Sequence, residues 1–117
     1  MISCISFFGW RTGHTLIQIV WEFMVRDGKA SEFEKFYAAT GPWATLFGGS
    51  PGFLGTTLLR DIGTARRYLT VDRWDNAASH RAMRERFAKQ YQAMDRDCQA
   101  LTETERQIGV FEDLESR

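Results

Sequence analysis

Residues 68–83, YLTVDRWDNAASHRAM, change their hydrophobic period part-way through, and this change strongly constrains the fold. Over residues 68–74 the side chains alternate between two sides, which is the period of a β-strand. Asp75-Asn76 ends the alternation, and the apolar residues that follow recur at helical spacing. The sequence therefore predicts a strand that leads directly into a long helix, extending from about residue 75 to about residue 102.

The same strand-to-helix order occurs earlier in the chain. In LIQIVWEFMV, residues 16–25, every second residue from Ile17 onward is large and apolar, which predicts a strand with one buried face. SEFE at residues 31–34 matches a capping box, in which Ser31 caps a helix and Glu34 reaches back to it. A short further helix is expected at PWATLF, residues 42–47, because proline suits the first helical turn.

Two more strands complete the pattern, FLGTTLLR at residues 53–60 and ETERQIGVFE at residues 103–112. Gly55 inside the first of these predicts a β-bulge or a close backbone approach. The order strand, helix, strand, strand, helix, strand is that of the split βαβ, ferredoxin-like α+β fold. It predicts a four-stranded antiparallel sheet with two main helices on one face.

A chain of 117 residues is expected to form one domain, here residues 16–114, with an N-terminal extension at residues 1–15 and a C-terminal tail at residues 115–117. One layer of helices covers only one face of a sheet. The other face is expected to carry apolar side chains, among them Val20, Met24 and Leu58. A second copy of the same sheet is the simplest cover, so a homodimer through sheet faces is expected. A monomer with a hydrated outer face is the alternative.

The charge balance and the cysteine content limit the kinds of binding partner and cofactor that are expected. Lys and Arg together number 15, as do Asp and Glu, so the net charge is zero, which argues against nucleic acid and against anionic membranes as partners. No apolar run approaches the roughly 20 residues that cross a bilayer. Cys4 and Cys98 are far apart and form no ligand cluster with His14 or His80. We therefore expect a cytoplasmic protein with free thiols, no metal site and no cofactor.

Four stretches, IVWEFMVRDGKASEFEKFY, GPWATLFGGSPGFLGTTLLRD, RRYLTVDRWDN and ERQIGVFE, resemble the antibiotic biosynthesis monooxygenase superfamily of dimeric α+β barrels. The resemblance covers about residues 17–111 and is more specific for the fold than for the chemistry, because the superfamily also includes haem-degrading and isomerase-like proteins. It implies a dimer whose two sheets form a barrel, and a pocket in each subunit between its sheet and its helices.

The oxygenases of this superfamily oxidise electron-rich polycyclic phenols with O2, without metal or flavin, because the deprotonated substrate supplies the electron. The resemblance implies a cofactor-independent monooxygenase of an aromatic or quinol-type small molecule. A non-catalytic module that binds a small apolar ligand or a protein partner is the alternative. Where haem-degrading relatives carry a histidine, a tryptophan and an asparagine, an ungapped offset places Ala93, Met83 and Trp21, which argues against haem degradation.

His80 is the candidate catalytic base or ligand anchor. It lies on the helix face expected to point toward the sheet, and an imidazole with a pKa of about 6.5 can accept a phenol proton at neutral pH. The alternative is a structural histidine whose ring binds a backbone carbonyl or Asp72.

The walls of a substrate pocket are expected from five aromatic residues, Trp21, Trp43, Phe47, Trp74 and Tyr91, although such residues also build ordinary cores. Asp72 shares a strand face with Trp74 and is expected at the same pocket. A buried carboxylate needs a partner, for which Arg60 or Arg67 is the expected cation.

Overall fold

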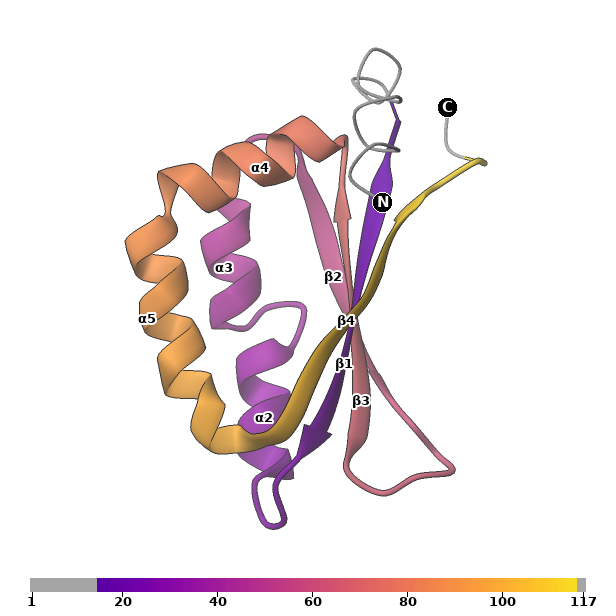
Figure 1. Cartoon of the computed structure of the whole chain (residues 1–117), viewed down its shortest axis with the longest axis vertical. Coiled ribbons are helices and arrows are strands. Elements are labelled where there is room, and N and C mark those ends of the chain that lie inside the picture. Colours follow the sequence, from indigo (N-terminus) through magenta and orange to yellow (C-terminus); the bar gives the residue numbers. More distant parts are fainter. Residues whose placement is uncertain (1–14, 116–117) are drawn as a thin grey trace.

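A four-stranded antiparallel sheet forms the centre of the structure, a computed structural model that describes residues 15–115. The strands are β1 (Ile17–Val25), β2 (Phe53–Arg60), β3 (Arg67–Trp74) and β4 (Thr102–Glu112). They lie in the order β2-β3-β1-β4, and each neighbouring pair is antiparallel (Figure 1). The predicted ferredoxin-like α+β fold is therefore confirmed.

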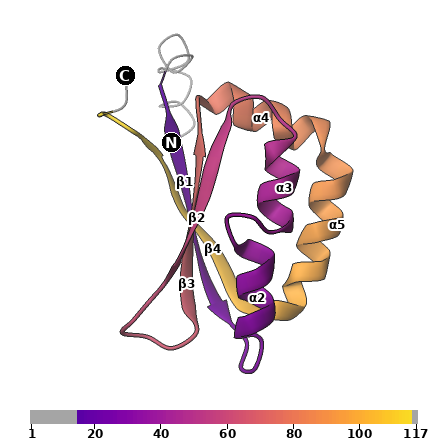
Figure 2. The same ribbon diagram turned by 180° about the vertical axis from the view of Figure 1, so that it is seen from behind.

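The helices all lie on one side of this sheet, as the two opposite views agree (Figures 1 and 2). They are α2 (Ala30–Tyr37), α3 (Pro42–Gly48), α4 (Ala77–Arg86) and α5 (Ala88–Cys98), and a 3-10 turn, η1 (Gln99–Leu101), leads into β4. Within residues 15–115, none of the helices has the length and apolar character needed to span a bilayer. The predicted N-terminal extension lies almost entirely outside the described residues.

The core lies between the inner face of the sheet and the helices. The alternation predicted for residues 17–25 is confirmed, because Ile17, Ile19, Phe23 and Val25 are buried while their neighbours are partly exposed. Burial of each such side chain contributes about 1.5–3 kcal/mol to folding. These side chains meet an aromatic layer from the helices, in which the rings of Phe33 and Phe23 lie 5.2 Å apart.

The long helix predicted after residue 75 is wrong in one respect, since it is divided into α4 and α5. Phe87, the residue between them, has φ −111° and ψ 29° and leaves the helical region. Its N–H still bonds to the Met83 carbonyl, and its own carbonyl accepts from the N–H of Tyr91. α4 therefore crosses one end of the sheet while α5 descends beside α3 (Figure 1).

The predicted capping box is also wrong. α2 begins one residue before Ser31, and its N-cap residue, Lys29, makes no capping hydrogen bond through its side chain. Glu34 instead accepts a hydrogen bond from the Tyr68 hydroxyl on β3 and lies 3.5 Å from the Arg60 guanidinium. The Glu34 carboxylate, which the capping box would have used, is therefore bound to side chains of the sheet.

Gly55 forms the predicted irregularity in β2. Its φ of +135° is a backbone conformation that favours glycine, and the register of β2 on β3 shifts between Phe53 and Gly55. Beyond the shift, Leu58 lies opposite Thr70 and packs against the core. The prediction that Leu58 faces outward is therefore wrong, and Leu59, which is 45% exposed, takes that side.

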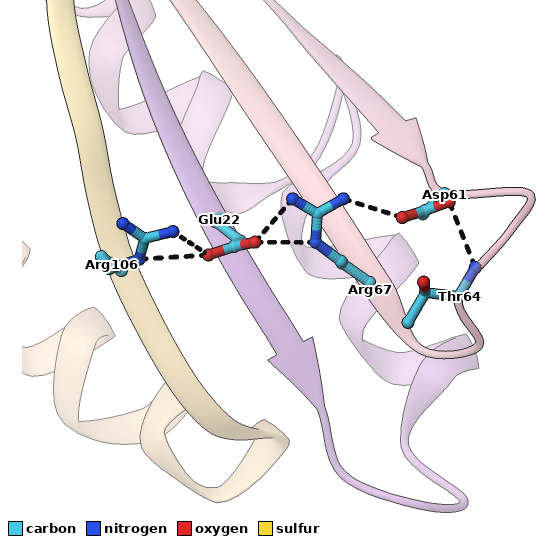
Figure 3. A network of polar contacts seen from close by, with 5 residues as sticks. All are labelled: Glu22, Asp61, Thr64, Arg67 and Arg106. Carbon is cyan, nitrogen blue, oxygen red and sulfur yellow. Dashed lines mark hydrogen bonds and ion pairs between the residues drawn. The ribbon is translucent and has the colours of Figure 1, made fainter.

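No helix of residues 15–115 lies on the outer face of the sheet, and charged side chains cross this face in a row (Figure 3). Glu22 on β1 binds Arg106 on β4 at 2.8 Å and Arg67 on β3 at 2.7 Å. Arg67 also binds Asp61, in the loop after β2, at 2.7 Å. This network ties three strands and a loop together across the face that lacks helices.

Candidate functional site

A pocket lies between the inner face of the sheet and the helices α2, α3 and α5. Phe23 and Thr70 belong to its floor, while Tyr37 and Phe47 contribute from the helices. The space inside that is open to water is about 40 Å³, enough for a few water molecules. A ring-sized ligand therefore needs some of the wall side chains to move.

The walls are mostly aromatic. The rings of Trp43 and Tyr91 meet edge to face at 4.9 Å, and Trp43 packs on Phe47 at 5.7 Å. Trp21 lines the opposite side and remains partly exposed. The structure thus brings four of the five predicted wall residues together at one pocket.

Trp74, the fifth, lies behind the wall. It is completely buried, and its ring packs on Phe47 at 5.9 Å and on Phe53 at 5.2 Å. It supports the pocket from the core and does not line it.

His80 also lies outside the pocket lining. Its ring packs edge-on against Trp74, with centroids 5.5 Å apart, and Trp74 in turn packs on Phe47 of the lining. Burial, together with the positive charges of Arg84 and Arg81, lowers the pKa of His80 to about 4. The imidazole is therefore neutral at pH 7 and is a weak base.

Asp72 lines the pocket from β3. Its Oδ1 accepts a hydrogen bond from the hydroxyl of Thr56 on the adjacent strand. The expected ion pair with Arg60 or Arg67 is wrong. Arg60 lies beside Glu34, and Arg67 points to the opposite face of the sheet because it is next to the inward-facing Tyr68.

Burial raises the pKa of Asp72 to about 6, against the opposing effects of the Thr56 hydrogen bond and the Arg73 charge. The carboxylate is thus mostly ionised at pH 7 but exchanges its proton close to neutrality. Such a group within an aromatic pocket is suited to accept a proton from a bound ligand and to return it.

Two threonines and two carboxylates of the pocket were not predicted from the sequence, namely Thr56, Thr70, Asp95 and Glu105. Burial raises the pKa of Glu105, and the charge of Asp95 adds to this effect. Asp95 follows Tyr91 by four residues, so helical spacing alone indicates that the two share a face. Within the described residues, no three acidic, histidine or cysteine groups are arranged to hold a metal ion.

A second hollow, of about 340 Å³, lies between α4 and the loop that precedes β2. Ser50, Ser79, Met83 and Arg86 are among its lining residues. The described residues that line it include no aromatic ring, no carboxylate and no predicted site residue. The pocket around Asp72 is therefore the candidate site, although it is the smaller of the two.

Comparisons with known proteins agree with this architecture. The antibiotic biosynthesis monooxygenase family model matches residues 16–95. SnoaB, a cofactor-independent oxygenase from Streptomyces nogalater, is 27% identical, with a TM-score of 0.67 over 83% of this chain and 91% of its own. No curated protein sequence matches this chain.

More distant structures share the fold. PA3566 from Pseudomonas aeruginosa is 16% identical, with a TM-score of 0.64 over 86% of this chain and 95% of its own. SO0527 from Shewanella oneidensis is 15% identical, with a TM-score of 0.58 over 86% of this chain and 92% of its own.

Proposed function

Because the chain belongs to the antibiotic biosynthesis monooxygenase family, we propose that it is a cofactor-independent oxygenase of an electron-rich aromatic small molecule. The observation that carries the proposal is the pocket, in which Trp21, Trp43 and Tyr91 surround a carboxylate, Asp72. Aromatic walls suit a flat ligand, and a buried group that exchanges protons near neutral pH suits its deprotonation. The similarity to SnoaB, itself a cofactor-independent oxygenase, adds support.

The proposed reaction uses a phenol whose ring system contains a methylene group, as in an anthrone. Loss of a proton gives an electron-rich anion, which transfers one electron to O2, and the two radicals combine as a peroxide. The O–O bond then breaks, one oxygen remains as a carbonyl, and the other leaves as water. The methylene supplies all four electrons that O2 takes up, so no external reductant is required.

The protein's part is to bind the ring and to exclude bulk water. Pockets for ligands of this size span about 300–1,000 Å³, whereas the space open to water here is about 40 Å³. Trp21 and Tyr91 are the partly exposed wall residues, so they are the side chains expected to swing outward when the ligand enters. Fluorescence of the pocket tryptophans should therefore change on binding.

The test is oxygen consumption with a panel of anthrones and hydroquinones under 18O2. With an anthrone we expect one labelled oxygen atom in the product carbonyl and one in water, whereas a hydroquinone has no methylene and its quinone should carry no label. Trp21→Ala should raise the KM about tenfold or more, because a wall of the pocket is lost. Ile62→Ala is the matched surface control, because Ile62 is fully exposed and should leave the rate unchanged. A wild-type protein that is inert toward the whole panel contradicts the proposal.

A non-catalytic module that binds a small apolar ligand is the second candidate, and the small volume of the pocket favours it. The two candidates differ in a simple measurement. If anthrones raise the Tm of the wild-type protein but no oxygen is consumed, the binding module is the better description.

We also propose that two copies pair through the outer faces of their sheets. Apolar side chains remain exposed there, with Leu59 at 45% and Phe111 at 49%, beside the partly exposed Val20, Leu69 and Val71. Sedimentation equilibrium should give twice the mass of one chain, and Leu59→Arg should lower it toward a single chain. A well-folded wild-type monomer at tens of micromolar would contradict this pairing.

A further inference from the structure

We propose that Asp72 is the catalytic residue that takes the proton from the substrate, and that Thr56 positions its carboxylate. This assignment rests on the proposed function and names the group that carries out its first step. It replaces the assignment of His80 as base that the sequence suggested.

The position of the carboxylate supports the assignment. Asp72 belongs to β3, where it lies opposite Ile19 of β1 and Thr56 of β2, on the inner face of the sheet. The Thr56 hydroxyl donates to Oδ1, and within the described part of the chain no donor reaches Oδ2. One oxygen is thus held in place, and the other remains available to the methylene of a ligand in the pocket.

The other charged groups that line the pocket are acidic, so none of them pairs with the Asp72 carboxylate. Asp95 and Tyr91 face the pocket from α5, and Glu105 faces it from β4. No lysine, arginine or histidine of the described residues lines the pocket.

Two arginines close to this region lie outside the lining. Arg84 of α4 lies 4.2 Å above the centre of the Tyr91 ring, and Arg73, the next residue in β3, points to the opposite face of the sheet, where it binds Thr57 at 2.9 Å. Burial without a paired cation makes Asp72 a stronger base than an ordinary carboxylate, and its pKa is accordingly raised to about 6.

His80 lacks both properties. It does not line the pocket, its ring packs on Trp74, and its pKa is lowered to about 4. A general base must lie within hydrogen-bond distance of the proton that it takes, and a side chain outside the lining does not meet this requirement.

Asp72 can carry out every proton transfer of the proposed reaction. The carboxylate takes one proton from the substrate, and the anion reacts with O2 to give a peroxide anion. Protonated Asp72 returns that proton to the outer peroxide oxygen. In the last step Asp72 takes the remaining C–H proton, the C–H electrons form the carbonyl, the O–O bond breaks, and the proton joins the departing hydroxide as water. Asp72 ends as it began, ionised.

The experiment compares Asp72→Asn, Thr56→Val and the wild type over pH 4–9. Asn keeps the shape and the acceptor for Thr56 but cannot take a proton, so we expect kcat to fall at least 100-fold while anthrone binding, followed by tryptophan fluorescence, is retained. Thr56→Val removes the hydrogen bond that lowers the Asp72 pKa. We therefore expect the acidic limb of the kcat/KM profile to move to higher pH in this variant.

The outcomes separate the two proposals. If the wild type consumes oxygen and Asp72→Asn does so at a similar rate, the role of Asp72 is wrong and the proposed function stands. An unmoved acidic limb in Thr56→Val, or a loss of activity in His80→Ala while Asp72→Asn remains active, also overturns the assignment. If the wild type is inert toward the panel, the proposed function fails and the assignment fails with it.

Discussion

The two faces of the sheet shift the pKa of a carboxylate in opposite directions. On the outer face, Glu22 binds two arginines, Arg106 and Arg67, and these hydrogen bonds lower its pKa (Figure 3). On the inner face, Asp72 has a single hydroxyl partner, Thr56, and burial raises its pKa to about 6. The two residues lie on adjacent strands of the same sheet.

The difference separates a carboxylate that is paired across the sheet from the one that we propose takes part in the chemistry. Glu22 links β1 to β3 and β4 at all but acidic pH. Asp72 is ionised at neutral pH in a place that disfavours its charge, so it lowers the stability of the protein there. Residues that reduce stability in this way are concentrated at functional sites.

The largest expected effect comes from the aromatic support beneath the inner face. Trp74→Ala should destabilise the protein by about 3–5 kcal/mol, because a completely buried ring leaves a cavity between Phe47 and Phe53. Leu59→Ala on the outer face should cost about 1 kcal/mol or less at protein concentrations too low for two copies to pair, since that side chain is 45% exposed in a single chain. Urea denaturation measures both, and equal losses would contradict the contrast between the faces.

Asp72→Asn should make the protein more stable at pH 7, by about 2 kcal/mol. The raised pKa means that the folded state binds this proton more tightly than the unfolded chain does, so ionisation at pH 7 weakens folding. The full shift from 3.8 to about 6 corresponds to about 3 kcal/mol, which partial solvation reduces. A drop in the free energy of unfolding would instead indicate that the carboxylate has a stabilising partner.

Asp72 and His80 should make opposite contributions to the pH dependence of stability. Asp72, with its raised pKa, makes stability fall as the pH rises from about 4 to about 6. His80, with its lowered pKa, makes stability rise from about pH 4 to about 6.5. In the wild type these trends oppose each other.

Single variants should remove one trend and leave the other. The stability of Asp72→Asn should rise across this range by up to about 2 kcal/mol, and that of His80→Gln should fall by a similar amount. Chemical denaturation at half-unit steps of pH provides the measurement. Profiles for both variants that are parallel to the wild type would show that neither pKa is shifted.

The smallest effect is expected at the outer carboxylate. Glu22→Gln removes the charge that Arg67 and Arg106 share, so the Tm should fall slightly, and the loss should shrink in 1 M NaCl because exposed ion pairs are screened. The change at Asp72→Asn should depend much less on salt. A Glu22→Gln variant that matches the wild type at every salt concentration would show that the network contributes nothing to stability.

The parts of the fold that follow from local periodicity were predictable. Alternation in residues 17–25 identified the buried face of β1, and the strand and helix order identified the fold. The same reasoning predicted four residues that line the pocket, because each belongs to an element whose apolar face packs against the core. They are Trp21, Trp43, Phe47 and Tyr91.

The features that the sequence did not predict depend on how the helices and strands pack against one another. The bend at Phe87 contains neither proline nor glycine, and the hydrophobic period continues through it, so the pattern gives no sign of it. The contact of Asp72 with Thr56 depends on the register of β2 after the shift at Gly55. His80 was predicted to face inward, and it does contact Trp74, but its position relative to the pocket follows from where α4 lies on the sheet.

The most direct test of this account is the pKa of the Asp72 side chain, measured by NMR titration of its carboxyl carbon in the wild-type protein and assigned by comparison with Asp72→Asn. We expect a value of about 6, which should rise in Thr56→Val. A value at or below the 3.8 of an ordinary aspartate would show that a cation or further donors hold this carboxylate ionised, and the contrast between the two faces of the sheet would be lost.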